Sequence, residues 1–174
     1  MLVAVTGTPG VGKSSACRIL VARGCAVIDL NKLAMERGFI LGRDEERDTA
    51  IIDTQQLNEV VSSISDDLVF LNGHLSHLLD VDISIVLRCN PTRLRARLAS
   101  LGWMERKIAE NVEAEAIDFI LVESLELDRE TYEIDTTEKG PDDVAQDILN
   151  IVNGKSSGFR AGSVDWSEVI MSWY

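Results

Sequence analysis

The chain has 174 residues, of which 45% are hydrophobic, and its 17 lysines and arginines against 29 aspartates and glutamates give a formal net charge of −12. That length and hydrophobic share fit one domain with a buried core, while the acidic balance argues against direct, sequence-specific binding to nucleic acid. The longest apolar runs fall far short of the roughly 20 residues that span a bilayer, and no basic and apolar leader opens the sequence, so we expect a cytoplasmic protein that is neither membrane-bound nor secreted.

Short apolar runs alternate along the chain with segments of helical periodicity, which is typical of an α/β fold with a largely parallel sheet. In chain order, we expect strands at Leu2–Val5, Ala26–Leu30, Leu68–Leu71, Ile83–Cys89 and Thr131–Asp135. Between and after them we expect helices from Lys13 to about Gly24, at Asn31–Arg37, at Leu57–Ile64, from Pro91 to Gly102, from Met104 to Leu127 and from Pro141 to Val152. The nearly continuous hydrophobicity of the third and fourth strands suits a sheet that is covered on both faces.

Three segments carry further expectations. The polar stretch after Arg37, up to residue 50, predicts an excursion over the surface. The expected helix from Met104 to Leu127 is a single long acidic one. Its inner stripe consists of Ile108, Val112, Ala116, Phe119 and Ile120. Asn90 and Pro91 predict the start of the preceding helix, with the asparagine as N-cap and the proline at the first helical position.

The C-terminal part of the chain, residues 153–174, predicts a linker followed by a short amphipathic tail. Residues 153–163 hold three glycines among serines, a composition typical of a flexible linker. Beyond them Trp166, Val169, Ile170 and Trp173 recur at helical spacing, and Asp165 can cap that segment. The tail either docks on its own domain or binds a partner in a groove.

The most specific signal is Gly7-Thr8-Pro9-Gly10-Val11-Gly12-Lys13-Ser14, which matches the P-loop pattern G-x-x-x-x-G-K-S in full between an expected strand and an expected helix. The glycines let successive amides curl around an anion, and the helix adds the positive end of its dipole. Lys13 can reach the β- and γ-phosphates, and the Ser14 hydroxyl can ligate Mg²⁺. The motif therefore predicts ATP binding in a three-layer α/β P-loop NTPase fold, with a five-stranded parallel sheet and the site at the carboxyl ends of the strands.

The rest of the sequence narrows the class of P-loop protein. A small GTPase needs a guanine-reading Asn-Lys-x-Asp on a later strand, and Asn31-Lys32-Leu33-Ala34 lacks the aspartate and lies too close to the P-loop. Motor and transporter ATPases need longer chains. A small nucleotide or metabolite kinase remains, in which a short lid closes over the phosphates so that the phosphoryl group meets its acceptor and not water.

Several further segments carry a resemblance to a known family. They read GTPGVGKS, GRDEERDTAIID, GHLSH, VLRCNPTRLRARL, GWMERKIAENVEAE and IDTTEKGPDDVA, in that order over residues 1–152. Together they resemble the archaeal adenylate kinases that are related to the nuclear, ribosome-biogenesis adenylate kinases of eukaryotes. The resemblance implies reversible, Mg²⁺-dependent phosphoryl transfer between ATP and a nucleoside monophosphate, chiefly AMP. It also implies an ATPase activity tied to small ribosomal subunit maturation and pre-ribosomes, through transient binding of a small-subunit ribosomal protein.

The resemblance also implies roles for individual positions. The triphosphate cradle would consist of Gly10, Gly12, Lys13, Ser14 and Ser15. The monophosphate-binding segment would span about residues 29–52, the lid about residues 102–112, and residues 135–141 would flank the adenine. Arg97 corresponds to an arginine that meets the transferred phosphate, with a solvated helix charge as the alternative. Lys107 in the lid fits a surface lysine better than a phosphate ligand.

Further polar residues leave alternatives open. His74 is either a group that orients water or phosphate, or a capping or core histidine. His74 and His77 together make a weak case for a metal pair because no third ligand is evident. Asp29 and Asp53 each end an apolar run, where each can cap a helix or act around Mg²⁺ or the acceptor.

Three positions depart from the family pattern. Asn72 stands where the family has an acidic residue, Leu101 where a lid arginine is expected, and Met35 where an acceptor-side arginine is expected. Arg37, Arg43 or Arg47 can substitute on the acceptor side, or each can be a solvated charge. We therefore expect intact nucleotide binding with weaker kinase turnover than the family norm. The alternative functions are an ATP-driven assembly factor for a ribosomal protein, and a small-metabolite kinase such as a dephospho-coenzyme A or shikimate kinase.

Overall fold

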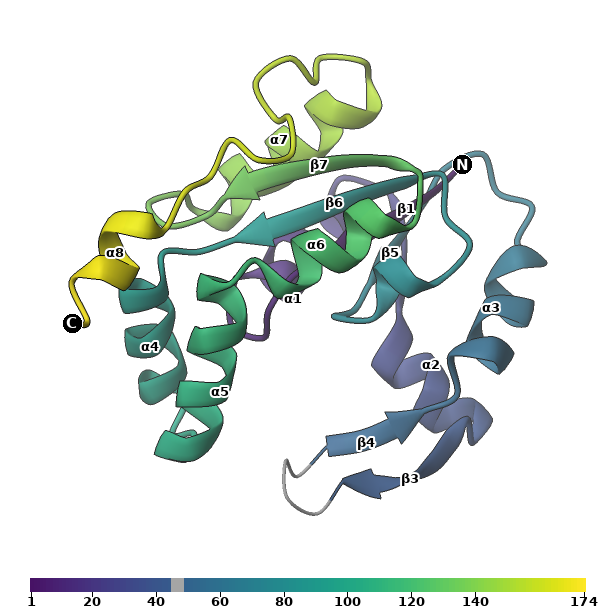
Figure 1. Ribbon diagram of the computed structural model, residues 1–174. Coiled ribbons are helices and arrows are strands. Elements are labelled where there is room, and N and C mark those ends of the chain that lie inside the picture. The colour runs from purple at the N-terminus through teal and green to yellow at the C-terminus, as the bar shows by residue number, and fades with distance from the viewer. Residues whose placement is uncertain (45–48) are drawn as a thin grey trace.

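The computed structural model describes residues 1–44 and 49–174 (Figure 1). Its main sheet has five strands in the order β2-β5-β1-β6-β7, and every neighbouring pair runs parallel. The strands are β1 (Leu2–Thr6), β2 (Ala26–Asp29), β5 (Val69–Asn72), β6 (Ile83–Arg88) and β7 (Glu130–Asp135). The predicted α/β class and the five-stranded parallel sheet are confirmed.

Helices cover both faces of this sheet. They are α1 (Lys13–Ala22), α2 (Leu30–Arg37), α3 (Thr54–Ser62), the 3-10 helix η1 (Ser76–Leu78), α4 (Pro91–Ser100), α5 (Glu105–Ala116), α6 (Phe119–Glu126), α7 (Pro141–Val152) and α8 (Ser167–Met171). Alternate residues of the central strand enter different cores: Val3 and Val5 pack with residues of α1, α4, α5 and α7, and Ala4 packs with residues of α2, α3 and β5. In Figure 1, α1 and α7 lie behind the sheet and α6 in front of it, so the sheet is the middle of three layers.

The prediction of a single long helix from Met104 to Leu127 is wrong, because the chain forms two helices there, α5 and α6. The break falls at Asp118, whose φ of 58° lies in the left-handed region. An ion pair between the Asp118 carboxylate and the buried Arg88 guanidinium accompanies this backbone conformation. The turn also removes Phe119 from the inner stripe, where it was expected, and leaves it half-exposed.

The segment after Arg37 contains more regular structure than its polarity indicates. Strands β3 (Ile40–Asp44) and β4 (Thr49–Ile52) pair antiparallel in a two-stranded sheet of their own. This hairpin projects away from the main sheet in Figure 1. Most of its side chains are exposed, so it lacks the buried alternation by which a strand is recognised in a sequence.

The C-terminal segment folds back along β7. The backbone N–H of Glu133 donates to the carbonyl of Phe159 at 2.9 Å, and Tyr132 and Arg160 form an antiparallel bridge. Trp166 is only 7% exposed. Residues 159–166 therefore dock on their own domain, although residues up to 163 were expected as a linker. Within the residues that the structure describes, no helix is long and apolar enough to cross a bilayer.

Candidate active site

The P-loop motif forms the turn that links β1 to α1. Gly7, Gly10 and Gly12 have φ values of 132°, 92° and 110°, in the left-handed region that favours glycine. A Cβ atom at Gly7 would lie 2.3 Å from the carbonyl oxygen of Leu87, and one at Gly10 would lie 2.6 Å from Cδ2 of Leu98. The conformation of the loop and its close approach to β6 and α4 therefore both require glycine.

Lys13 is the first residue of α1 and its side chain lies under the loop. Its ammonium group donates to the carbonyl of Gly7 at 2.6 Å and to that of Thr8 at 2.9 Å. Burial lowers the pKa of Lys13 to about 8, and the negative charge of Glu115 opposes this change. A phosphate bound in the loop would favour the ammonium form of Lys13 and so raise this lowered pKa again.

Ser14, Asn72 and Asp29 meet at the carboxyl ends of the strands. Asp29 and Asn72 pair in the register of β2 and β5. The Asn72 amide nitrogen donates to Asp29 Oδ2 at 3.1 Å and to Ser14 Oγ at 3.4 Å. Because a carboxylate only accepts, this contact fixes the orientation of the amide. Asn72 is 6% exposed and its Oδ1 has no hydrogen-bond partner.

This cluster fits a hard divalent cation. A hydroxyl, a carboxylate and an amide oxygen are donors that Mg²⁺ takes directly or through water. The unpartnered Oδ1 of Asn72 is a buried acceptor that would otherwise carry a desolvation penalty. Among the described residues there is no group of three or more histidines, cysteines, aspartates or glutamates placed to hold a metal ion, so this site would depend on mixed oxygen donors and on the phosphates themselves.

The two histidines have different environments, and both ring nitrogens of His77 contact protein groups. His77 is fully buried, with its Nδ1 at 2.9 Å from Thr6 Oγ1 and its Nε2 at 3.2 Å from Glu123 Oε2. His74 is partly exposed, and burial together with the charge of Lys13 lowers its pKa to about 4. At neutral pH the His74 imidazole is therefore uncharged, so it can orient a hydroxyl or a water but cannot act as a cation.

Arg97 links the P-loop to the loop after β7. Its guanidinium donates to the carbonyls of Thr136 at 2.8 Å and Thr137 at 3.1 Å, to Thr136 Oγ1 at 3.3 Å and to the carbonyl of Val11 at 3.4 Å. It also lines a cavity of about 270 Å³, whose walls comprise Gly10, Val11, Gly12, Ser15, Arg97, Thr136, Lys139, Pro141 and Val144. Arg97 is thus no solvated helix charge; it shapes the cavity beside the P-loop.

The other residues that the sequence analysis singled out lie in or at the ends of several different helices. Leu101 is 64% exposed at the end of α4, and Met35 is 72% exposed on α2. Asp53 caps α3 by accepting from the backbone N–H of Gln56 at 3.1 Å, and Asp29 caps α2 in the same way through Lys32. Lys107 lies over the ring of Trp103, with its Nζ 4.9 Å from the ring centroid.

The structure describes two of the three arginines that were candidates for binding the acceptor. Arg37 lies in the last turn of α2, and Arg43 lies on the hairpin strand β3. The third candidate, Arg47, lies outside the residues that the structure describes.

A buried ionic cluster beside the P-loop was not predicted. Arg88 is 1% exposed and contacts the carboxylates of Glu115 at 2.8 Å and Glu133 at 3.1 Å, as well as that of Asp118. Glu115 is 3% exposed and accepts from Thr8 Oγ1 at 2.6 Å. The sequence held one signal, since Glu115 falls on the apolar face of its helix, where an unpaired charge would be costly.

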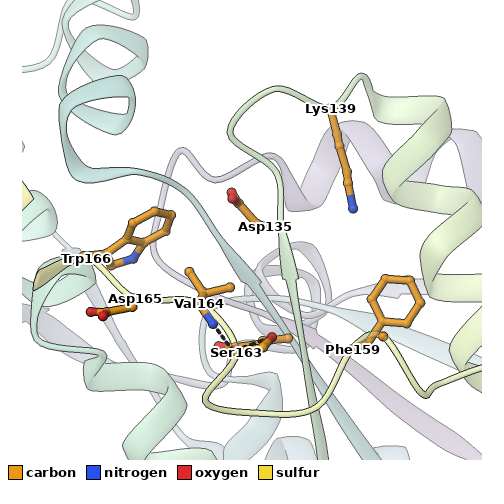
Figure 2. Close-up of a pocket in the computed structure, with 9 residues that line it drawn as sticks. Asp135, Lys139, Phe159, Ser163, Val164, Asp165 and Trp166 are labelled. Carbon is orange, nitrogen blue, oxygen red and sulfur yellow. Dashed lines mark hydrogen bonds between the residues drawn. The ribbon is translucent and has the colours of Figure 1, made fainter. Parts of the chain in front are cut away.

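A second cavity, of about 310 Å³, lies between β7 and the C-terminal segment. Figure 2 shows Lys139 and Phe159 on one side of it, Trp166 on the other and Asp135 between them. Lys139 also lines the cavity beside the P-loop, so the two spaces are neighbours.

The chain is similar to a known family and to several known proteins. Residues 3–118 match a family profile described as an AAA domain. The chain is 44% identical to a protein of Archaeoglobus fulgidus over 95% of its own length and 92% of that protein, and 42% identical to a protein of Thermococcus kodakarensis over 97% and 94%. Both carry the name "Putative adenylate kinase".

Among solved structures, the shikimate kinase of Acinetobacter baumannii in complex with shikimate matches with a TM-score of 0.62. The match covers 90% of this chain and 94% of that one, at 16% identity. At this identity the likeness concerns the fold alone.

Proposed function

The chain belongs to the family of archaeal P-loop adenylate kinases, and on that premise we propose that it transfers a phosphoryl group reversibly from ATP to a nucleoside monophosphate, chiefly AMP, with Mg²⁺. The observation that carries the proposal is the complete P-loop, with Lys13 beneath it and the oxygen cluster of Ser14, Asn72 and Asp29 beside it. Cation, amides and hard oxygen donors converge there on the volume that a triphosphate would fill.

In this proposal the chain supplies positioning and charge, and no covalent intermediate forms. The amides of Gly10, Gly12, Lys13, Ser14 and Ser15 bind the phosphates, and the Lys13 ammonium neutralises charge on the transferred group. When bound, Mg²⁺ would supply further compensation for the negative charge of the phosphates. Ser14 would hold it, together with Asn72 and Asp29 either directly or through water. The neutral imidazole of His74 would orient the acceptor oxygen or a water.

The proposal assigns the other parts of the site as follows. The cavity lined by Arg97, Thr136 and Pro141 would take the nucleoside of ATP, which gives Arg97 a positioning role. Residues 29–52 would bind the monophosphate, and residues 102–112 would close as a lid that excludes water. Because Leu101 and Met35 put no guanidinium on the transferred phosphate, we expect turnover below the family norm.

A coupled assay of ADP formation tests this function. We expect ADP to form from ATP, Mg²⁺ and AMP, more slowly from other nucleoside monophosphates, and slowest without an acceptor. The Lys13→Ala variant should lose both ATP binding and turnover. Turnover of shikimate or another metabolite with no response to AMP would replace the proposal with a metabolite kinase, and ordinary adenylate kinase rates would contradict the expectation of weak turnover.

A second candidate is an ATP-driven assembly factor for a small-subunit ribosomal protein in the pre-ribosome. It is favoured by the apolar outer face of α6, where Phe119, Val122 and Leu125 are all about half-exposed. ATP hydrolysis that needs no AMP and that a ribosomal protein stimulates would support this second function. Hydrolysis unaffected by such a protein would count against it.

A further inference from the structure

The carboxylate of Glu115 lies where separate parts of the chain meet. Glu115 lies on the buried face of α5, and its Oε2 accepts from the Thr8 hydroxyl of the P-loop at 2.6 Å. Its Oε1 accepts from Arg88 Nε at 2.8 Å, from the backbone N–H of Cys89 at 3.1 Å and from Trp166 Nε1 at 3.3 Å. One buried carboxylate therefore connects the P-loop, the end of β6 and the C-terminal segment.

The C-terminal segment reaches this cluster by a second path. Glu133 Oε1 accepts from the backbone N–H of Val164 at 2.6 Å and from the Ser163 hydroxyl at 3.1 Å, and its Oε2 accepts from Arg88. The Arg88 guanidinium also lies 5.8 Å from the ring centroid of Trp166. Figure 2 shows Trp166 and Val164 on the segment that runs past the end of β7.

We propose that Glu115 is a positioning residue of the nucleotide site, and that Trp166 of the C-terminal segment holds it in place, so that residues 159–166 help to form the ATP site without touching ATP. The proposal rests on the proposed function, since it concerns how the P-loop is held for a triphosphate.

The contact between Glu115 and Thr8 holds the P-loop against α5. Desolvating a carboxylate is costly unless all of its lone pairs are matched, and the Thr8 hydroxyl is the donor on Oε2. A P-loop that moved away from α5 would leave this oxygen buried without that donor. Glu115 therefore stabilises one position of Thr8 before ATP arrives, which reduces the ordering that binding requires.

Calorimetric titration of the full chain with Mg²⁺ and a non-hydrolysable ATP analogue at pH 7 tests the proposal. Glu115→Gln should raise Kd about tenfold. Trp166→Phe keeps an aromatic side chain but removes the indole N–H, and should raise Kd about threefold. Trp173→Phe, in the same tail but beyond α8, is the matched control and should match the parent.

A double-mutant cycle between Trp166 and Glu115 distinguishes a positioning role from a general loss of stability. If Trp166 acts through Glu115, Trp166→Phe should raise Kd less in the Glu115→Gln background than in the parent. Thr8→Val removes the hydroxyl donor and should by itself raise Kd, so this single variant tests the contact if Glu115→Gln fails to fold.

Two outcomes are distinguishable. A parent that binds the analogue, with Glu115→Gln and Trp166→Phe variants that match its Kd, would overturn this inference and leave the kinase proposal standing. A parent that takes up no nucleotide would overturn both.

Discussion

Raising the pH from 7 to 9 should weaken ATP binding, because burial lowers the pKa of Lys13 to about 8. Below that pH the group is an ammonium, and above it the charge that meets the phosphates is lost. Bound phosphate restores the pKa of the lysine, so the affinity depends on the fraction that is protonated in the free protein. With a free pKa of about 8, Kd varies as 1 + 10^(pH − 8), which is about a tenfold rise between pH 7 and pH 9.

Calorimetry in buffers of different ionisation enthalpy measures this effect as proton uptake on binding. Free Lys13 is half deprotonated at about pH 8. When ATP binds, Lys13 should therefore take up about half a proton at pH 8 and nearly a full proton at pH 9. Lys13→Arg is the control because a guanidinium stays charged throughout this range, and its Kd should not depend on pH. A parent protein whose Kd is flat from pH 7 to 9, with no proton uptake, would refute the electrostatic reasoning.

Three further predictions concern single positions. Asp29→Asn should weaken Mn²⁺ binding to the complex with ADP about tenfold by electron paramagnetic resonance, whereas Asp53→Asn, at another helix cap, should not; equal losses would remove Asp29 from the metal site. Gly7→Ala should lower the free energy of unfolding by about 3 kcal/mol or more in urea denaturation, because its Cβ would lie 2.3 Å from a backbone carbonyl oxygen of β6. Gly162→Ala, whose Cβ meets nothing within 4 Å, should lose only the smaller strain of its positive φ, and a similar loss at both sites would contradict the packing argument. Leu101→Arg should raise kcat for ADP formation about tenfold or more with little change in KM for ATP, and an unchanged kcat in steady-state kinetics would show that the lid does not need a guanidinium there.

The parts of the fold that the sequence predicted well are those encoded locally. The P-loop is set by glycines whose conformations no other residue adopts easily, and Asn90 caps α4 as expected, accepting from the backbone N–H of Thr92 at 3.0 Å. The buried strands were recognisable because both of their faces are apolar. The hairpin of β3 and β4 was not, since its exposed strands carry no such pattern.

The break between α5 and α6 could not be predicted, because the helical period continues through it. Asp118 takes a left-handed conformation, and its side chain pairs with Arg88, which lies 30 residues earlier. The same holds for Glu115, whose contacts with Thr8 and Trp166 span 107 and 51 residues. A charge on an apolar helix face indicates that a buried partner exists, but the partner is set by the packing of the whole chain.

The departure at Asn72 has a different meaning once the strand register is known. From the sequence alone, an amide at this position removes an anionic group from the end of β5. In the structure β2 and β5 pair so that Asp29 faces Asn72, and the carboxylate of Asp29 accepts from the Asn72 amide nitrogen at 3.1 Å. The negative charge thus lies on the neighbouring strand, within hydrogen-bond distance of the same position. A second carboxylate at residue 72 would lie against the first, where like charges raise the pKa of one of them. The reason to expect weak turnover is therefore the missing guanidinium groups at Leu101 and Met35, and not a missing charge at Asn72.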